Sequence, residues 1–87
     1  MNATTKHTVT LDREITALNV HTRTGQLLSN DLRIPGGTKL RILGQQKIMP
    51  TGDLETTFEA QVPDTDELRA GLWRFLTYDL PDYGLDA

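Results

Sequence analysis

Residues 54–62 read Leu54-Glu55-Thr56-Thr57-Phe58-Glu59-Ala60-Gln61-Val62. Apolar or threonine side chains alternate along this stretch with Glu, Thr and Gln. A period of two is typical of a half-buried strand, in which successive side chains point to opposite faces. Residues 38–43 alternate in the same way, with Lys39 and Arg41 on the polar face. We therefore predict an antiparallel ribbon in which these two cations lie across from Glu55 and Glu59.

Three further stretches have the pattern of strands, namely residues 6–11, 15–22 and 72–78. In the second of them we expect Leu18 and Val20 to point inward. The chain contains thirteen Thr and one Ser, and the β-branched Thr favours strands. Between the strands, Ile34-Pro35-Gly36-Gly37 has the composition of a type II turn, in which Gly36 would take the positive φ.

Two segments are ambiguous. Residues 26–33 can form a short helical turn or an irregular, partly buried loop. Residues 64–70 resemble the start of a helix, with Asp64 as N-cap and Glu67 three positions later. A helix that continues through Gly71 would lose about 1 kcal/mol there, and residues 72–78 are rich in strand formers. We favour one helical turn followed by a strand, and a longer helix is the alternative.

The length and the strand pattern together predict one small β domain. The 87 residues form a single domain, with an N-terminal arm at residues 1–5 and an acidic C-terminal tail at residues 79–87. We expect a mainly β fold, a small antiparallel five-stranded barrel or sandwich with at most one short helix.

Three short motifs of this layout are similar to one known family. They are Ala17-Leu18-Asn19-Val20, the stretch Ile34-Pro35-Gly36-Gly37-Thr38-Lys39-Leu40-Arg41-Ile42-Leu43-Gly44, and Leu72-Trp73-Arg74-Phe75. In order and spacing they resemble the bacterial Src-homology-3-like small β-barrels, over residues 15–78. The chain departs from the family pattern at residues 21–25, where the loop that shapes a ligand groove would lie. The resemblance implies a barrel fold and a non-catalytic binding or adaptor role.

Charge is divided unevenly along the chain. Residues 1–44 carry six Lys/Arg and three Asp/Glu, or +3, whereas residues 45–87 carry three and nine, or −6, and the sum is the net charge of −3. Two interpretations follow. The halves can attract each other across a sheet, or the acidic end can be a docking surface for a basic partner.

The sequence carries no recognisable catalytic signature. There is no Cys, and the single Ser, Ser29, lacks the flanking glycines of a nucleophile elbow. The two imidazoles, His7 and His21, have no close metal-ligand spacing. We therefore predict that the protein is not an enzyme and holds neither cofactor nor metal. It has no apolar run of the ~20 residues that span a bilayer and no signal peptide, so we expect the cytoplasm or a particle assembled there.

Nucleic-acid binding is the less favoured of the macromolecular roles. Four cations are candidates for a basic face: Arg23, Arg33, Lys39 and Arg41. Single-strand binders interleave such cations with stacking aromatics, whereas the aromatic cluster of this chain lies in its acidic half.

A protein-binding role is the leading functional prediction. The candidate contact residues are Trp73, Phe75, Tyr78, Asp79, Leu80, Asp82, Tyr83 and Leu85. We expect an accessory subunit, adaptor or inhibitor in a larger homo- or hetero-oligomeric assembly, of possible phage origin and without a small-molecule substrate. The alternatives are a structural virion component of the cement type and a nucleic-acid-binding small barrel.

Overall fold

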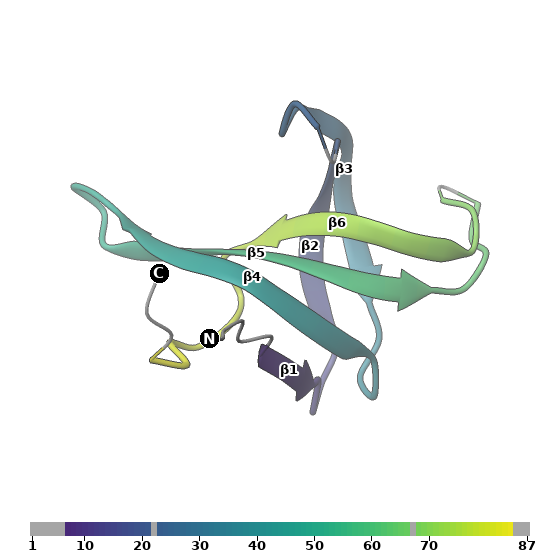
Figure 1. Cartoon of the computed structure of the whole chain (residues 1–87), viewed down its shortest axis with the longest axis horizontal. Coiled ribbons are helices and arrows are strands. Elements are labelled where there is room, and N and C mark those ends of the chain that lie inside the picture. Colours follow the sequence, from purple (N-terminus) through teal and green to yellow (C-terminus); the bar gives the residue numbers. More distant parts are fainter. Residues whose placement is uncertain (1–6, 22, 67, 85–87) are drawn as a thin grey trace, which may run out of the picture.

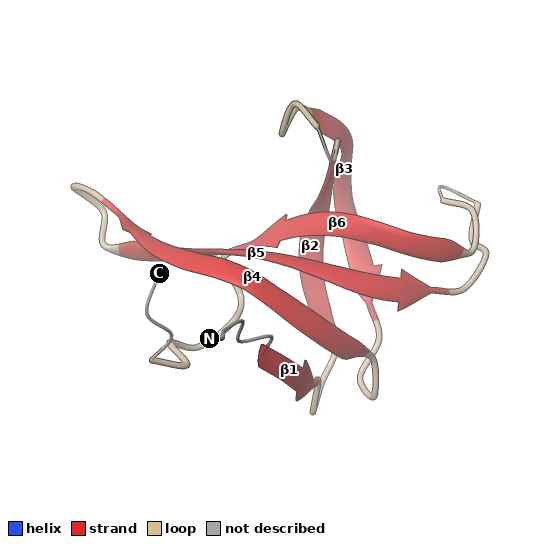
Figure 2. Cartoon of the chain, in the orientation of Figure 1, coloured by secondary structure: helices blue, strands red, loops and turns tan. Residues whose placement is uncertain are grey.

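The computed structural model describes residues 7–21, 23–66 and 68–84. The described residues form six antiparallel strands and no helix (Figures 1 and 2). The strands are β1 (His7–Thr10), β2 (Ile15–Val20), β3 (Leu27–Ile34), β4 (Lys39–Ile48), β5 (Asp53–Val62) and β6 (Gly71–Thr77).

The strands make one sheet in the order β1-β4-β5-β6-β2-β3. In Figure 1, β2 and β3 run steeply across β4, β5 and β6, so the sheet bends until its two parts face each other. The mainly β prediction is confirmed. The strand number of five and the closed barrel are wrong, because the described residues form six strands in a sheet that does not close: its edges, β1 and β3, are not paired with each other.

The core lies between the two parts of the bent sheet. At its centre Phe58 of β5 and Phe75 of β6, both fully buried, stack with ring centroids 5.4 Å apart. Alternating residues of β2, β3, β4 and β5 close around them: Ile15, Ala17, Leu32, Ile34, Leu40, Ile42, Ala60 and Val62. Burial of each large side chain contributes roughly 1.5–3 kcal/mol, so the period-two pattern accounts for the fold.

The predicted β4–β5 ribbon is present, with one of its two charge pairs. Arg41 is the direct cross-strand partner of Glu59 and makes an ion pair with it. The other pair is wrong, because the two cations are two residues apart and the two glutamates four, so an antiparallel register can match only one of them. Glu55 lies opposite Gln46, and Lys39 lies opposite Thr10 of β1.

The inward face of β2 is the reverse of the predicted one. Ile15 and Ala17 are in the core, whereas Leu18 is only half-buried. Val20 is buried but lies opposite Arg74 on the outer face, apart from the core cluster. The pairing with β6 sets the inward face, because Asn19 lies opposite the fully buried Phe75, and Ile15 and Ala17 share the face of Asn19 by alternation.

The helical turn predicted at residues 64–70 is also wrong for the described part of that segment. Asp64 does not cap a helix, because its carboxylate accepts a hydrogen bond from the N–H of Ala70, six residues later. Thr65 and Leu68 instead close a turn, with the Thr65 N–H donating to the Leu68 carbonyl at 2.8 Å. Such local side-chain bonds compete with helix formation.

The segment after β6 is part of the folded body as far as residue 84. Leu80 is 7% exposed within the core, and Tyr83 packs against that core. Gln45 of β4 holds the segment with both ends of its amide, donating to the Pro81 carbonyl at 2.9 Å and accepting from the Tyr83 N–H at 3.1 Å.

Candidate functional site

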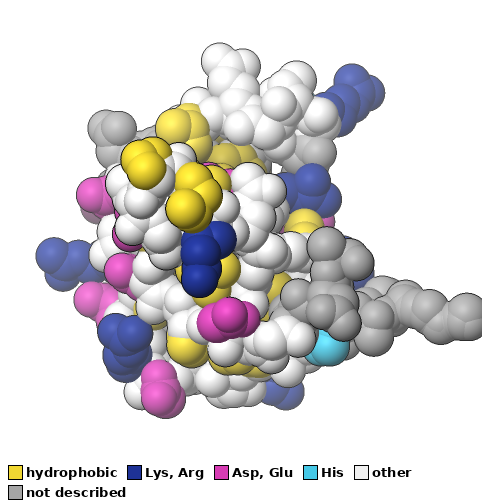
Figure 3. All heavy atoms as spheres, turned by 90° about the vertical axis from the view of Figure 1, so that its left-hand side faces the viewer, with side chains coloured by type: hydrophobic (Ala, Val, Ile, Leu, Met, Phe, Trp, Pro, Cys, Tyr) yellow, Lys and Arg dark blue, Asp and Glu magenta, His cyan; other side chains and the backbone are white. Residues whose placement is uncertain are grey.

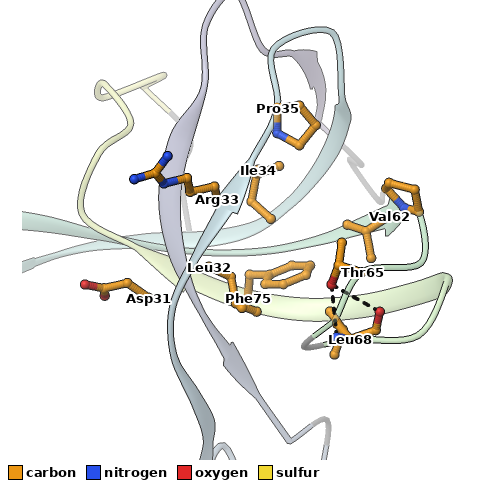
Figure 4. Close-up of a pocket in the computed structure, with 10 residues that line it drawn as sticks. Asp31, Leu32, Arg33, Ile34, Pro35, Val62, Thr65, Leu68 and Phe75 are labelled. Carbon is orange, nitrogen blue, oxygen red and sulfur yellow. Dashed lines mark hydrogen bonds between the residues drawn. The ribbon is translucent and has the colours of Figure 1, made fainter.

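A cleft opens beside β3, between this strand and residues 62–68 (Figure 4). Its volume is about 300 Å³. The cleft is mainly apolar and reaches the fully buried Phe75 of β6. Its remaining lining consists of Asp31, Leu32, Arg33, Ile34, Pro35, Val62, Pro63, Thr65 and Leu68.

Alternation along β3 explains how one wall is built. Leu32 and Ile34 are buried, whereas Asp31 and Arg33 are exposed, and in Figure 4 these two charged side chains point away from Phe75. The wall on this side therefore consists of two apolar side chains and the backbone of the strand. The far wall is held by Thr65, whose hydroxyl accepts from the Leu68 N–H at 3.0 Å.

β3 is an edge strand of the sheet. Among the described strands it pairs with β2 alone, so its other side presents backbone N–H and C=O groups that can bind a further strand. Its pairing with β2 is irregular: Val20 lies opposite Leu27 and Leu18 opposite Asp31, so that three residues of β3 face one of β2. The regular part of the edge is therefore residues 31–34, directly beside the cleft.

The outer face of the sheet carries a charge cluster separate from the cleft. Glu59 lies between Arg41 on β4 and Arg74 on β6, its direct cross-strand partners, and makes ion pairs with both. Burial raises the pKa of the Glu59 carboxyl, but the hydrogen bonds and positive charges of the two arginines outweigh it, so the pKa lies below the ordinary value of 4.5. The cluster ties three strands together.

Three of the aromatic residues predicted for partner binding lie on or just after β6, in different surroundings. Phe75 is in the core and forms part of the cleft. Trp73 is half-buried, and its indole N–H donates to the Arg69 carbonyl at 2.7 Å. Tyr78 is 51% exposed on the outer face, where its hydroxyl donates to Glu55. That hydrogen bond, with some burial and the nearby carboxylates, raises the pKa of Tyr78.

The remaining candidates belong to the C-terminal segment. Leu80 and Tyr83 face the core of their own chain. Asp79 accepts a hydrogen bond from the Thr16 N–H, and Asp82 accepts one from the Gly84 N–H. Leu85 lies outside the described residues. The seven described candidates are thus spread over the core, the outer face and the C-terminal segment.

The four basic-face candidates come from two strands and a loop. Arg33 is on β3, Lys39 and Arg41 are on β4, and Arg23 is in the loop before β3. Of these, Arg41 is engaged by Glu59.

Of the residues that line the cleft, sequence reasoning singled out Phe75 and Arg33 but not the others. Leu32 and Ile34 lie in or next to the segment that was ambiguous, and Leu68 was assigned to a helical turn. One signal was present: Asp31-Leu32-Arg33-Ile34 alternates with a period of two, which is typical of a half-buried strand.

A second exposed apolar area is the tip of the β4–β5 hairpin. Met49 is 73% exposed there, and Ile48 and Leu54 are half-buried. Figure 3 faces this end of the molecule and shows hydrophobic side chains interspersed with charged ones. This area is therefore mixed in character and lacks a cleft of the kind beside β3.

Within the described ranges, no three His, Asp or Glu side chains gather as metal ligands. The same residues include no helix with the length and hydropathy that a bilayer span requires. Comparison of the chain with protein-family models, curated proteins and solved structures finds no match.

Proposed function

We propose that this chain is a non-catalytic protein-binding component of a larger protein assembly. The observation that supports this proposal is the apolar cleft beside the open edge of β3. An extended segment of a partner can pair with an exposed sheet edge, with backbone hydrogen bonds giving affinity and side-chain pockets giving specificity. A binding role is also what the resemblance to the Src-homology-3-like barrels implies.

The dimensions of the cleft are consistent with a peptide side chain as its occupant. Its volume of about 300 Å³ lies at the lower end of the range for ligand pockets, roughly 300–1,000 Å³. A partner side chain that enters it contacts Leu68, and complete burial of such an apolar group contributes roughly 1.5–3 kcal/mol. Backbone pairing along residues 31–34 adds to this, so an extended segment suits the site better than a small ligand.

Affinity capture with three baits tests this role. The baits are the wild-type chain, Leu68→Asp in the cleft, and the control Leu72→Asp, which places the same charge on a β6 side chain that is 62% exposed on the outer face. We expect the wild type and the control to capture the same partner, and Leu68→Asp to bind it at least about tenfold more weakly, since a charge in an apolar contact is costly. Mass spectrometry identifies the partner, and titration of the purified partner measures the affinities.

Circular dichroism of the three baits shows whether Leu68→Asp remains folded. Equal capture by folded Leu68→Asp and wild type would place binding elsewhere on the molecule. Absence of any captured protein would argue against the role itself.

A further inference from the structure

We propose that the strand which adds to β3 is β3 of a second copy of this chain, paired antiparallel about a two-fold axis at Leu32. The resulting homodimer has one continuous sheet across the two copies. This inference rests on the proposed function, because it names the partner that occupies the β3 edge.

The charged residues on either side of Leu32 define the sequence that a strand added to this edge should have. Asp31 and Arg33 are exposed and share one face of β3, and among the described residues neither takes part in an ion pair. An antiparallel partner that complements them must carry an acid opposite Arg33, an apolar residue opposite Leu32 and a base opposite Asp31. In chain order this is acid, apolar, base, which is the sequence Asp31-Leu32-Arg33 itself.

One other triplet in the chain, residues 67–69, has the same order of acid, apolar residue and base. Its apolar member, Leu68, already lines the cleft and is hydrogen-bonded to Thr65. Residues 31–33 are therefore the copy of this pattern that is available as a strand.

The faces of the strand restrict the register to a few choices. A symmetric pairing must place core-facing residues opposite core-facing residues, because a slip by one residue turns every side chain to the other face. An axis at Asp31 would set Asp against Asp, and an axis at Arg33 would set Arg against Arg, and like charges directly opposite are destabilising. An axis at Leu32 instead forms two Asp31–Arg33 pairs.

The irregular part of β3 is consistent with this register. The shift against β2 leaves residues 31–34 as the regular edge, and an axis at Leu32 pairs residues 31–33 of the two copies within that stretch. Because the strands run in opposite directions, the N-terminal end of one β3 lies beside the C-terminal end of the other. The exposed Leu27 and Leu28 then approach the partner copy near Pro35, which borders its cleft.

A charge-swap experiment tests the pairing. Sedimentation equilibrium over a wide range of protein concentration is measured for the wild type, for Asp31→Arg, for Arg33→Asp and for an equimolar mixture of the two variants. The wild type is expected to dimerise. Each variant alone opposes like charges at both pairs, so its dissociation constant rises at least about tenfold. The mixture regains dimerisation, because two Arg on one chain face two Asp on the other.

The controls are Asp53→Arg and Lys47→Asp, which make the same changes in net charge at exposed residues of the β4–β5 hairpin, and both should dimerise like the wild type. A wild type that stays monomeric overturns the inference, as do variants that dimerise normally or a mixture that does not recover. One outcome separates the two proposals. If the wild type is monomeric and captures another protein, and Leu68→Asp loses that protein, the second-copy assignment fails while the binding role remains supported.

Discussion

At the scale of single residues, Glu59 is the one charged side chain that is buried among the described residues. Removing a carboxylate from water is costly unless it is paired and hydrogen-bonded, and the flanking Arg41 and Arg74 supply both ion pairs. The arrangement follows from register alone, because the three residues lie side by side on neighbouring strands. The position of Glu59 on the polar face follows from the alternating sequence, and its two arginine partners follow from the order of the strands.

We predict that Glu59→Gln lowers the free energy of unfolding at neutral pH by about 1–3 kcal/mol, since hydrogen bonds to charged groups are lost. Because the folded-state pKa of Glu59 is depressed, its contribution is fully present above the ordinary value of 4.5 and is lost as the pH falls through the folded-state pKa. The difference between wild type and variant should thus shrink in acid. Urea unfolding measured across this pH range checks both statements.

Glu55→Gln is the matched control for that experiment. Glu55 lies on the same strand and face, is half-buried and accepts a hydrogen bond from the neutral hydroxyl of Tyr78. We expect it to cost no more than about 1 kcal/mol. Equal effects of the two substitutions, or an acid dependence of Glu59→Gln identical to that of the wild type, would contradict the role given to Glu59.

Two aromatic residues of β6 should differ in their contribution to stability. Phe75 is fully buried and stacked on Phe58, so Phe75→Ala is expected to cost about 3–5 kcal/mol. Trp73 is half-buried at the margin of the core, so Trp73→Ala should cost less, because less apolar area returns to water. Denaturant unfolding of both variants measures the two losses in free energy of unfolding. A larger loss for Trp73→Ala than for Phe75→Ala would show that the centre of the core lies elsewhere.

At the scale of elements, the C-terminal segment, residues 79–84, packs as part of the fold although it is not a strand. It lacks alternation, and Leu80 reaches the core while Gln45 binds its backbone. Arg13 adds a contact from the turn after β1 by donating to the Asp79 carbonyl at 3.1 Å. The segment thereby covers the end of the core that the open sheet leaves exposed.

Deletion of residues 79–87 should lower the free energy of unfolding by about 3 kcal/mol or more, because the loss of buried Leu80 alone is comparable to a Leu→Ala substitution in a core. Urea titration of the truncated chain gives the value. Leu80→Ala in the full chain should reproduce most of the loss, whereas Asp82→Asn, at an exposed position, should have little effect. A truncated chain as stable as the wild type would show that the segment only rests on the surface.

The turn between β3 and β4 shows how two adjacent glycines have separate roles. The positive φ predicted for Gly36 belongs to Gly37, at +88°. Gly36 is favoured for a different reason, because a Cβ atom there would make a tight contact of 3.3 Å with backbone atoms of Arg13. The turn after β1 packs against this turn, which no local pattern in residues 34–37 could indicate.

At the scale of the whole molecule, the fold joins segments that are far apart in sequence. β1 pairs with β4, and β2 pairs with both β3 and β6. The two edge strands of the resulting sheet differ in length and in surroundings. β1 is short, with four residues, and β3 has eight residues and borders the cleft. The longer edge is therefore the one at which a further strand can be added.

A disulfide can test the placement of β1. Thr10 and Lys39 are direct cross-strand partners and both are exposed. In the cysteine-free chain, Thr10→Cys with Lys39→Cys should oxidise within one molecule and stabilise it by about 2–4 kcal/mol over its reduced form. Thermal unfolding with and without reductant measures this difference.

Thr10→Cys with Lys47→Cys is the control, because Lys47 lies further along β4 than the paired residues. It should form no intramolecular bond. Failure of the Thr10–Lys39 pair to oxidise, or a loss of stability on oxidation, would mean that β1 is not held beside β4.

The sequence by itself determined the strands at residues 38–43 and 54–62 and the pairing of Arg41 with Glu59, because alternation and a hairpin connection are local properties. It also determined that the fold is mainly β. It did not determine the inward face of β2, which depends on strands distant in the chain, or the strand character of the whole of residues 27–34, of which only residues 31–34 alternate. The turn of Thr65 and Leu68 is made by local hydrogen bonds that compete with the helix start this segment resembles. Only the tertiary structure decided that β3 is an open edge beside an apolar cleft, because long-range pairing chooses which strands lie at the edges of a sheet.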